Sequence, residues 1–264
     1  MSTSPRRPQS LAPATVSEFD GVRYLHLGTP WVQGAMRIAR PNALELEYVQ
    51  RMMAWMLWRP AEALCDGLAV QFGLGAASIT RFCHKALRMQ TISVEINASV
   101  IAACRHGFRL PADDERLSVV HDDAAHWVAD PSHRQTAQVL HVDLYDHDAA
   151  APVLDDEGFY RACRGVLVDG DGRNGGLLSV NLFGRDASFE ASVGRIASVF
   201  GADQVWNLRP TREGNTIVIA GRGVALPDRA DLAARADNIE ARFGLPARKW
   251  LRMIRVPLPH PSSA

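Results

Sequence analysis

The acidic segment between residues 143 and 157 is the part of the sequence with the clearest chemical potential. It holds six Asp and Glu side chains and no Lys or Arg, although the 264-residue chain as a whole balances 29 basic against 29 acidic residues. Such a segment attracts cations, and an amine is the obvious guest. Neighbouring carboxylates also raise one another's pKa, which suits a general base. Two other interpretations stay open: a solvated acidic loop, and a divalent metal site with Asp143, Asp146 and Asp148 as oxygen ligands.

A second candidate feature is a glycine turn followed at a distance by a carboxylate. Gly73 and Gly75 follow the apolar run 68–72 and open a helical stretch, where free amide groups and bare backbone suit a ligand. Glu95 ends the next apolar run, where a carboxylate can accept hydrogen bonds from both hydroxyls of a ribose. Together they indicate an adenosine-type ligand, either a nicotinamide dinucleotide or S-adenosylmethionine. Ser78 departs mildly from the dinucleotide pattern, and a tight turn without a ligand would have the same sequence.

Asp122 and Asp123 follow a third apolar run. A carboxylate at this place can accept a hydrogen bond from the amino group of adenine. Asp is also a favoured N-cap, so either residue can begin a helix over 124–128. The two roles are compatible. The sequence contains no G-x-S-x-G nucleophile elbow, Walker A lysine motif or H-E-x-x-H pair, which removes most support for hydrolase and nucleoside-triphosphatase functions.

These candidate residues all lie at the ends of short apolar runs that alternate with helical stretches. The runs occupy residues 68–72, 91–95, 117–120, 138–143, 176–182, 204–206 and 215–220. Alternating strands and helices predict an α/β fold with a doubly wound, mostly parallel, seven-stranded sheet buried on both faces. Ligands bind at the carboxyl ends of the strands in such sheets, and the polar residues above are at those ends.

The first 60 residues have a different pattern. Residues 19–27 predict a hairpin with Asp20-Gly21 as its turn, and 31–39 a further strand. Residues 44–58 predict a helix with a wide apolar face, whose Met and Trp side chains we expect in the core. The expected organisation is a disordered tail at 1–16, a small N-terminal β domain at 17–42, a catalytic domain at 43–256 and a second tail at 257–264.

The composition excludes several classes of protein. A net charge of zero argues against a nucleic-acid surface, and no run approaches 18 apolar residues, so we expect neither a nucleic-acid nor a membrane partner. The N-terminus lacks the apolar stretch of a secretory signal. Cys65, Cys83, Cys104 and Cys163 show no C-x-x-C spacing. They are typical of reduced thiols in a cytoplasmic protein.

The order and spacing of several short motifs resemble the polyamine aminopropyltransferases, the spermidine and spermine synthases, and more closely their short bacterial spermidine synthase-like relatives. The resemblance covers roughly residues 31–223. It rests on the segments 32–37, 48–53, 72–75, 94–97, 113–116, 123–124, 143–146, 152–154 and 159–160. No single segment is specific, but their order and spacing together are.

The resemblance implies a small N-terminal β domain before a methyltransferase-like (Rossmann-like) sheet. It implies decarboxylated S-adenosylmethionine as a co-substrate that donates an aminopropyl group, a diamine or polyamine as acceptor, no tightly bound cofactor and no metal. On the donor side, carried over by position, Glu95 would hold the ribose hydroxyls and Asp123 with Ala124 would recognise the adenine. The remaining donor contacts would come from Gln33, Gly73 and Gly75.

On the acceptor side, the resemblance implies that Asp143 takes the proton from the attacking amine. Asp146 would help to position that amine, and Tyr48, Gln50 and Tyr145 would line its channel. The physical chemistry agrees, because an amine with a pKa near 10.4 is a poor nucleophile while protonated. A carboxylate beside it can accept the proton as attack begins.

Three departures from the family pattern leave alternatives open. Ala76 stands where the family has an acidic residue that contacts the amine of the donor, Asn97 replaces an Asp, and no proline follows Asp146. One alternative is therefore a methyltransferase that uses intact S-adenosylmethionine on another amine. Another is a non-catalytic protein that binds an adenosine ligand. The hairpin region 19–39 offers strand edges for a homodimer.

Overall fold

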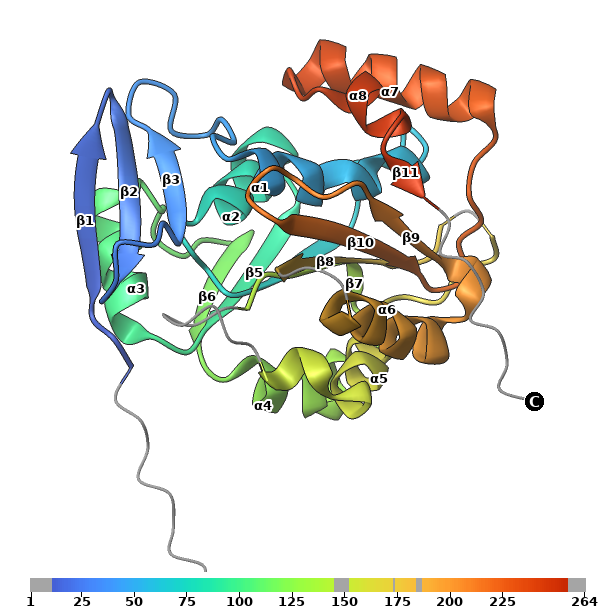
Figure 1. Cartoon of the computed structure of the whole chain (residues 1–264), viewed down its shortest axis with the longest axis horizontal. Helices are drawn as coiled ribbons and strands as arrows, with labels where there is room; N and C mark the ends of the chain where they lie inside the picture. Colours follow the sequence, from blue (N-terminus) through green and yellow to red (C-terminus); the bar gives the residue numbers. More distant parts are fainter. Residues whose placement is uncertain (1–10, 145–151, 173, 184–186, 256–264) are drawn as a thin grey trace, which may run out of the picture.

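The chain forms a small antiparallel sheet and a large, mostly parallel sheet covered by helices on both faces (Figure 1). This computed structural model describes residues 11–144, 152–172, 174–183 and 187–255. The strands of the large sheet are β4 (Leu68–Phe72), β5 (Gln90–Glu95), β6 (Leu117–His121), β7 (Ala137–Val142), β8 (Leu177–Phe183), β9 (Val205–Leu208), β10 (Asn215–Gly221) and β11 (Ile254–Arg255).

The strand order is β11-β9-β10-β8-β7-β4-β5-β6. Neighbours from β6 to β8 pair in parallel, whereas the pairs β8–β10, β10–β9 and β9–β11 are antiparallel. The expected doubly wound sheet is confirmed, but the expected count of seven strands is wrong. The eighth strand, β11, has only two residues, too few to show a periodic pattern, and it exists through its pairing with β9.

The small sheet holds β1 (Ala14–Phe19), β2 (Val22–Leu27) and β3 (Gly34–Arg37). Asp20 and Gly21 both have positive φ, at 49° and 71°, as the expected two-residue hairpin turn requires. The first strand, β1, begins at Ala14, inside the segment 1–16 expected to be a disordered tail. The reason is tertiary: the Ala14 amide donates to Ser99 Oγ at 2.9 Å, which ties the start of β1 to the adjacent helix.

The helices and single turns divide between the two faces of the large sheet (Figure 1). They are α1 (Glu47–Met52), η1 (Met53–Trp58), α2 (Ser78–Arg81), η2 (Phe82–Ala86), α3 (Ala98–Gly107), α4 (Ala124–Ala129), η3 (Pro131–His133), η4 (Pro152–Asp155), α5 (Glu157–Val166), α6 (Ala187–Phe200), η5 (Ala202–Gln204), α7 (Arg229–Phe243) and α8 (Ala247–Leu251). One face carries α1, α2, α7 and α8, and the other carries α4, α5 and α6.

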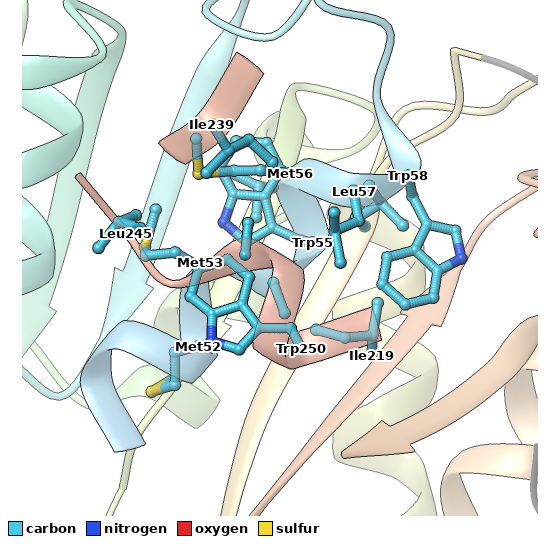
Figure 2. Packing of buried hydrophobic residues seen from close by; sticks show 14 of the residues in the cluster. Met52, Met53, Trp55, Met56, Leu57, Trp58, Ile219, Ile239, Leu245 and Trp250 are labelled. Atoms are coloured by element: carbon cyan, nitrogen blue, oxygen red, sulfur yellow. The ribbon is translucent and has the colours of Figure 1, made fainter. Parts of the chain in front are cut away.

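The Met- and Trp-rich segment forms the core under α7 and α8, as expected. Figure 2 shows Trp55 and Met56 packed with Ile239 of α7, and Trp250 of α8 beside Met52. The expected single helix over 44–58 is wrong in its winding, because α1 passes into the 3₁₀ segment η1 at Met53. Three residues per turn align positions i and i+3, and every η1 side chain is buried.

Candidate functional site

The candidate site lies where the chain leaves β4 and β7 toward opposite faces of the sheet. The chain after β4 forms α2, and the chain after β7 forms α5 on the other face (Figure 1). The two strands are parallel neighbours, and the amide of Asp143 extends their pairing by donating to the carbonyl of Phe72 at 3.0 Å. Such a switch point leaves a crevice outside the carboxyl ends of the strands, which is where α/β sheets bind ligands.

The glycine turn after β4 is built around conformations that L side chains rarely adopt. Gly73 has φ +82° and Gly75 has φ +50°, and Ala77 also has a positive φ of 55°. A Cβ on Gly73 would overlap the carbonyl oxygen of Asp143. Gly73 is therefore required by the close approach of the two segments, with or without a ligand. The structure brings both predicted glycines to the switch point.

A chain of buried hydrogen bonds joins this turn to β4, α2 and β5. Gln71 Nε2 donates to the carbonyl of Gly73 at 2.6 Å, and Thr80 Oγ1 donates to Gln71 Oε1 at 2.7 Å. Thr80 Oγ1 also lies 2.7 Å from Ser93 Oγ on β5. All three polar side chains are buried and satisfied by one another, which fixes the turn relative to both strands.

The small sheet contacts the same turn through β3. A Cβ on Gly34 would overlap Ala76, and a Cβ on Gly75 would lie 3.1 Å from the carbonyl oxygen of Gln33. Gln33, predicted from the family resemblance to lie beside the donor, is thus next to the glycine turn and partly exposed. The N-terminal sheet thus packs directly against the glycine turn.

Glu95 lies at the end of β5, and both of its carboxylate oxygens accept backbone hydrogen bonds. Oε2 accepts from the amide of Leu74 and Oε1 from the amide of Asn97, each at 2.8 Å. Burial raises the pKa of Glu95, and these backbone donors lower it. The side chain therefore joins the glycine turn to the start of α3. Each oxygen keeps acceptor capacity for a ligand hydroxyl.

Asp123 and Ala124 lie at the start of α4, after β6. Asp123 Oδ1 accepts from the amide of Ala125 at 2.7 Å, so the N-cap interpretation is confirmed for this residue. Asp122 binds His126 Nδ1 at 2.8 Å, and this hydrogen bond lowers the pKa of Asp122. Asp123 is exposed and Ala124 is buried. The adenine role of this pair stays a prediction.

Asp143 follows β7 and is held by side chains from two other elements. Asn181 Nδ2 of β8 donates to Asp143 Oδ1 at 2.9 Å, and the Tyr48 side chain of α1 also forms a hydrogen bond to the carboxylate. Burial raises the pKa of Asp143, while both hydrogen bonds lower it. A partly buried carboxylate with a raised pKa at a crevice is a suitable proton acceptor.

Sequence reasoning missed Asn181 and its partner Asn215 on β10. Asn215 Nδ2 donates to Asn181 Oδ1 at 3.1 Å, which extends the cluster to a third strand. A signal did exist for Asn181, since it interrupts the apolar run of β8 and is only 2% exposed. A polar residue buried in such a run needs a partner. The sequence does not say which partner, because the pairing of β8 with β7 is set by the whole sheet.

Gln50 is not brought to this cluster, although it stands two positions from Tyr48 on α1. Two residues on a helix point to different sides, and Gln50 Nε2 donates to the carbonyl of Leu44 at 2.8 Å. Gln50 lines a separate cavity of about 620 Å³ whose wall also includes Arg37, Arg40 and Arg242. A wall with three arginines is a poor environment for a cationic amine.

Some predicted site residues cannot be placed. Tyr145, Asp146 and Asp148 lie outside the described residues. Within the described ranges no group of three or more His, Cys, Asp or Glu side chains is placed to hold a metal ion. In the same ranges no helix is long and apolar enough to cross a membrane.

His141 lies on β7, two residues before Asp143, and is fully buried. Its Nδ1 lies 3.3 Å from the carbonyl of Val70, so Nδ1 carries the proton. Its ring packs edge-on against Trp55. No described residue is a hydrogen-bond partner of Nε2. Burial lowers the pKa of His141 to about 4, so the ring is neutral at pH 7.

We therefore expect His141 to make the folded state less stable as the pH is lowered. An unfolded histidine takes up a proton near pH 6.5 and folded His141 only near pH 4, so the unfolded state binds more protons between these values. The stability lost from pH 7 to pH 4 through this residue is about 3 kcal/mol. Urea unfolding of His141→Leu across this range should lack that loss, whereas His106→Gln, an exposed site on α3, should keep it. If the free energy of unfolding changes equally with pH in His141→Leu and in the unmodified protein, His141 is not the group that causes the loss.

Comparisons with known proteins bear on the fold and on the family. No protein-family model matches the chain. Among solved structures, a probable spermidine synthase from Corynebacterium glutamicum superposes with a TM-score of 0.69 at 16% identity, covering 95% of this chain and 94% of that one. Human methyltransferase-like protein 13, solved in complex with SAH, superposes with a TM-score of 0.63 at 18% identity, covering 83% and 98%. At these identities the likeness shows the methyltransferase-like fold alone.

Sequence similarity identifies the family. A curated polyamine aminopropyltransferase from Neisseria meningitidis is 30% identical over 247 residues, which cover 93% of this chain and 90% of that protein. The match thus runs through the small sheet, the glycine turn and all the described residues of the crevice. Together with the fold, it confirms the resemblance predicted from the order of the motifs: the chain belongs to the polyamine aminopropyltransferase family.

Proposed function

We propose that this protein transfers an aminopropyl group from decarboxylated S-adenosylmethionine to a diamine or polyamine, with Asp143 as the general base. The observation that carries the proposal is the carboxylate of Asp143, held by Tyr48 and Asn181 at the switch point beside the glycine turn. It supports the proposal because the reaction needs one proton acceptor next to the donor pocket and little else.

The proposed reaction is a single displacement. The acceptor nitrogen attacks the carbon next to the sulfonium; a C–N bond forms, the C–S bond breaks and its electron pair stays on sulfur, giving 5′-methylthioadenosine. The proton leaves the nitrogen for Asp143. Holding two reactants in line can contribute ~7–11 kcal/mol, so positioning is the main task of the protein.

We propose that the donor lies along the carboxyl ends of β4, β5 and β6. Glu95 would accept the ribose hydroxyls with the lone pairs that Leu74 and Asn97 leave open, and Asp123 with Ala124 would flank the adenine. Gln33, Gly73 and Gly75 would contact the rest of the donor. On the acceptor side Tyr48 fits the proposal, Asp146 and Tyr145 stay predictions, and the placement of Gln50 gives its role no support.

One observation favours a second candidate, methyl transfer from intact S-adenosylmethionine. Ala76 is 2% exposed and is covered by Gly34 of β3, so no carboxylate stands at this point of the turn to bind an amine on the donor. An assay of product with each donor and a panel of amines separates the two. Methylthioadenosine that appears only with decarboxylated donor and an amine supports aminopropyl transfer. A methylated amine formed only from intact donor overturns it in favour of the second candidate.

We also propose a cytoplasmic homodimer. The described cysteines are all free thiols, which suits a reducing compartment. In the described part of the chain β1 pairs on one side only, with β2. Phe19 at the end of β1 and Trp31 in the loop between β2 and β3 are 77% and 70% exposed. Light scattering at micromolar concentration should therefore give twice the mass of one chain, and a monomer mass would contradict the dimer.

A further inference from the structure

A chain of two asparagines leads to Asp143: Asn181 contacts its carboxylate, and Asn215 contacts Asn181. Asn181 on β8 is 2% exposed, and its Nδ2 donates to Asp143 Oδ1 at 2.9 Å. Asn215 on β10 is half-buried, and its Nδ2 donates to Asn181 Oδ1 at 3.1 Å. The backbone of Asn215 is itself fixed by Thr211. The backbone N–H of Asn215 donates to Thr211 Oγ1 at 3.2 Å, and its backbone carbonyl accepts from the backbone N–H of Thr211 at 2.8 Å.

The chain of hydrogen bonds has a direction. An asparagine side chain has one acceptor end and one donor end. Because Asn215 donates to the oxygen of Asn181, the nitrogen of Asn181 is left facing Asp143. The opposite orientation would place an amide oxygen against a carboxylate oxygen, which is repulsive. Asn215 therefore acts on Asp143 through Asn181, without contacting it.

The surroundings of Asp143 make these hydrogen-bond donors important for its ionisation. The Tyr48 side chain on α1 also donates to the carboxylate, and His141, two residues earlier on β7, is neutral at pH 7. No charged side chain in the described ranges contributes to the pKa of Asp143; burial raises it and only Asn181 and Tyr48 lower it. Hydrogen bonds to a carboxylate are stronger than those between neutral groups. Among the described residues, these hydrogen bonds are what offsets the effect of burial on the pKa of Asp143.

We propose that Asn181 and Asn215 are positioning residues, which hold the Asp143 carboxylate in one orientation and in its ionised form for proton transfer. The proposal rests on the proposed function, in which Asp143 is the base. In this proposal Asn181 acts on the carboxylate of Asp143, and Asn215 acts through Asn181. Loss of either should leave Asp143 less ionised at a given pH and its carboxylate less well oriented, while leaving the donor pocket intact.

The test is the ionisation of Asp143 in the ligand-free protein, followed by carboxyl ¹³C NMR against pH. In Asn181→Leu, which removes the donor and keeps the number and branching of the side-chain heavy atoms, the midpoint should rise by about 1–2 pH units, the effect of losing one hydrogen bond to a charged group. Asn215→Ala should raise it less. Asn207→Ala is the matched control: Asn207 on β9 is also half-buried, its Nδ2 donates to the Leu208 carbonyl at 3.3 Å, and its variant should show no change.

An unchanged midpoint in Asn181→Leu overturns the proposal. If that variant does not fold, Asn215→Ala decides, and a midpoint equal to that of Asn207→Ala overturns it. With active protein, the acid limb of the rate profile should move with the midpoint, so that raising the pH restores much of the rate; an equal loss of kcat at every pH would indicate a merely structural role. If the unmodified protein transfers no aminopropyl group, the proposed function fails, and the NMR midpoint still decides whether the asparagines act on Asp143.

Discussion

Asp143→Asn is expected to lower aminopropyl transfer by about 10²–10⁴-fold, the usual contribution of a general base. The amide has nearly the shape of the carboxylate and keeps an oxygen for Asn181 Nδ2, so the fold and donor binding should survive. What it loses is the ability to take the proton from the attacking nitrogen. The measurement is the rate of methylthioadenosine formation with amine, beside calorimetric binding of the donor.

Asp203→Asn is the control, because Asp203 is exposed in η5 and its carboxylate accepts a hydrogen bond from Gln204 Nε2 at 3.4 Å. It should keep the full rate. The pH profile adds a second check: burial raises the pKa of Asp143, so the rate should fall as the pH drops through that pKa, and Asp143→Asn should lack this limb. An Asp143→Asn enzyme with an undiminished rate would remove the carboxylate from the mechanism.

Gly73→Ala is expected to destabilise the protein by about 2–5 kcal/mol. Two costs add: roughly 1–2 kcal/mol for a side chain at positive φ, and about 1–3 kcal/mol for forcing a methyl group into a filled space. The obstructing atom is the backbone carbonyl of Asp143, which cannot move without disturbing β7. Urea unfolding measures the loss directly.

Gly165→Ala provides the comparison within the same protein. Gly165 lies on α5, its φ is not positive, and an added Cβ would meet no atom within 4 Å. Alanine is favoured over glycine in a helix by up to about 1 kcal/mol, so this variant should be as stable as the unmodified chain or slightly more so. Equal stability of the two variants would show that the crowding at Gly73 is not real.

Much of the fold could be predicted because its signals are local. Each apolar run of five to seven residues became a strand, Asp20-Gly21 made the hairpin turn, and Gly73, Glu95 and Asp123 stand at strand ends as expected. These features depend on residues close together in the chain, whose conformational preferences need no distant partner. The order of the same motifs also indicated the family, which the Neisseria relative confirms.

The tertiary structure alone decided which of these residues meet. The pairing of β7 with β8 and of β8 with β10 brings Asn181 and Asn215 to Asp143, from 38 and a further 34 residues away. The orientation of α1 in the fold directs Tyr48 and Gln50 to different places. The short strand β11 forms by pairing with β9. The sequence by itself thus determined the strand ends where chemistry can occur and the family to which the chain belongs. Register and packing, which depend on the free energy of the whole sheet, determined the hydrogen bonds to the base.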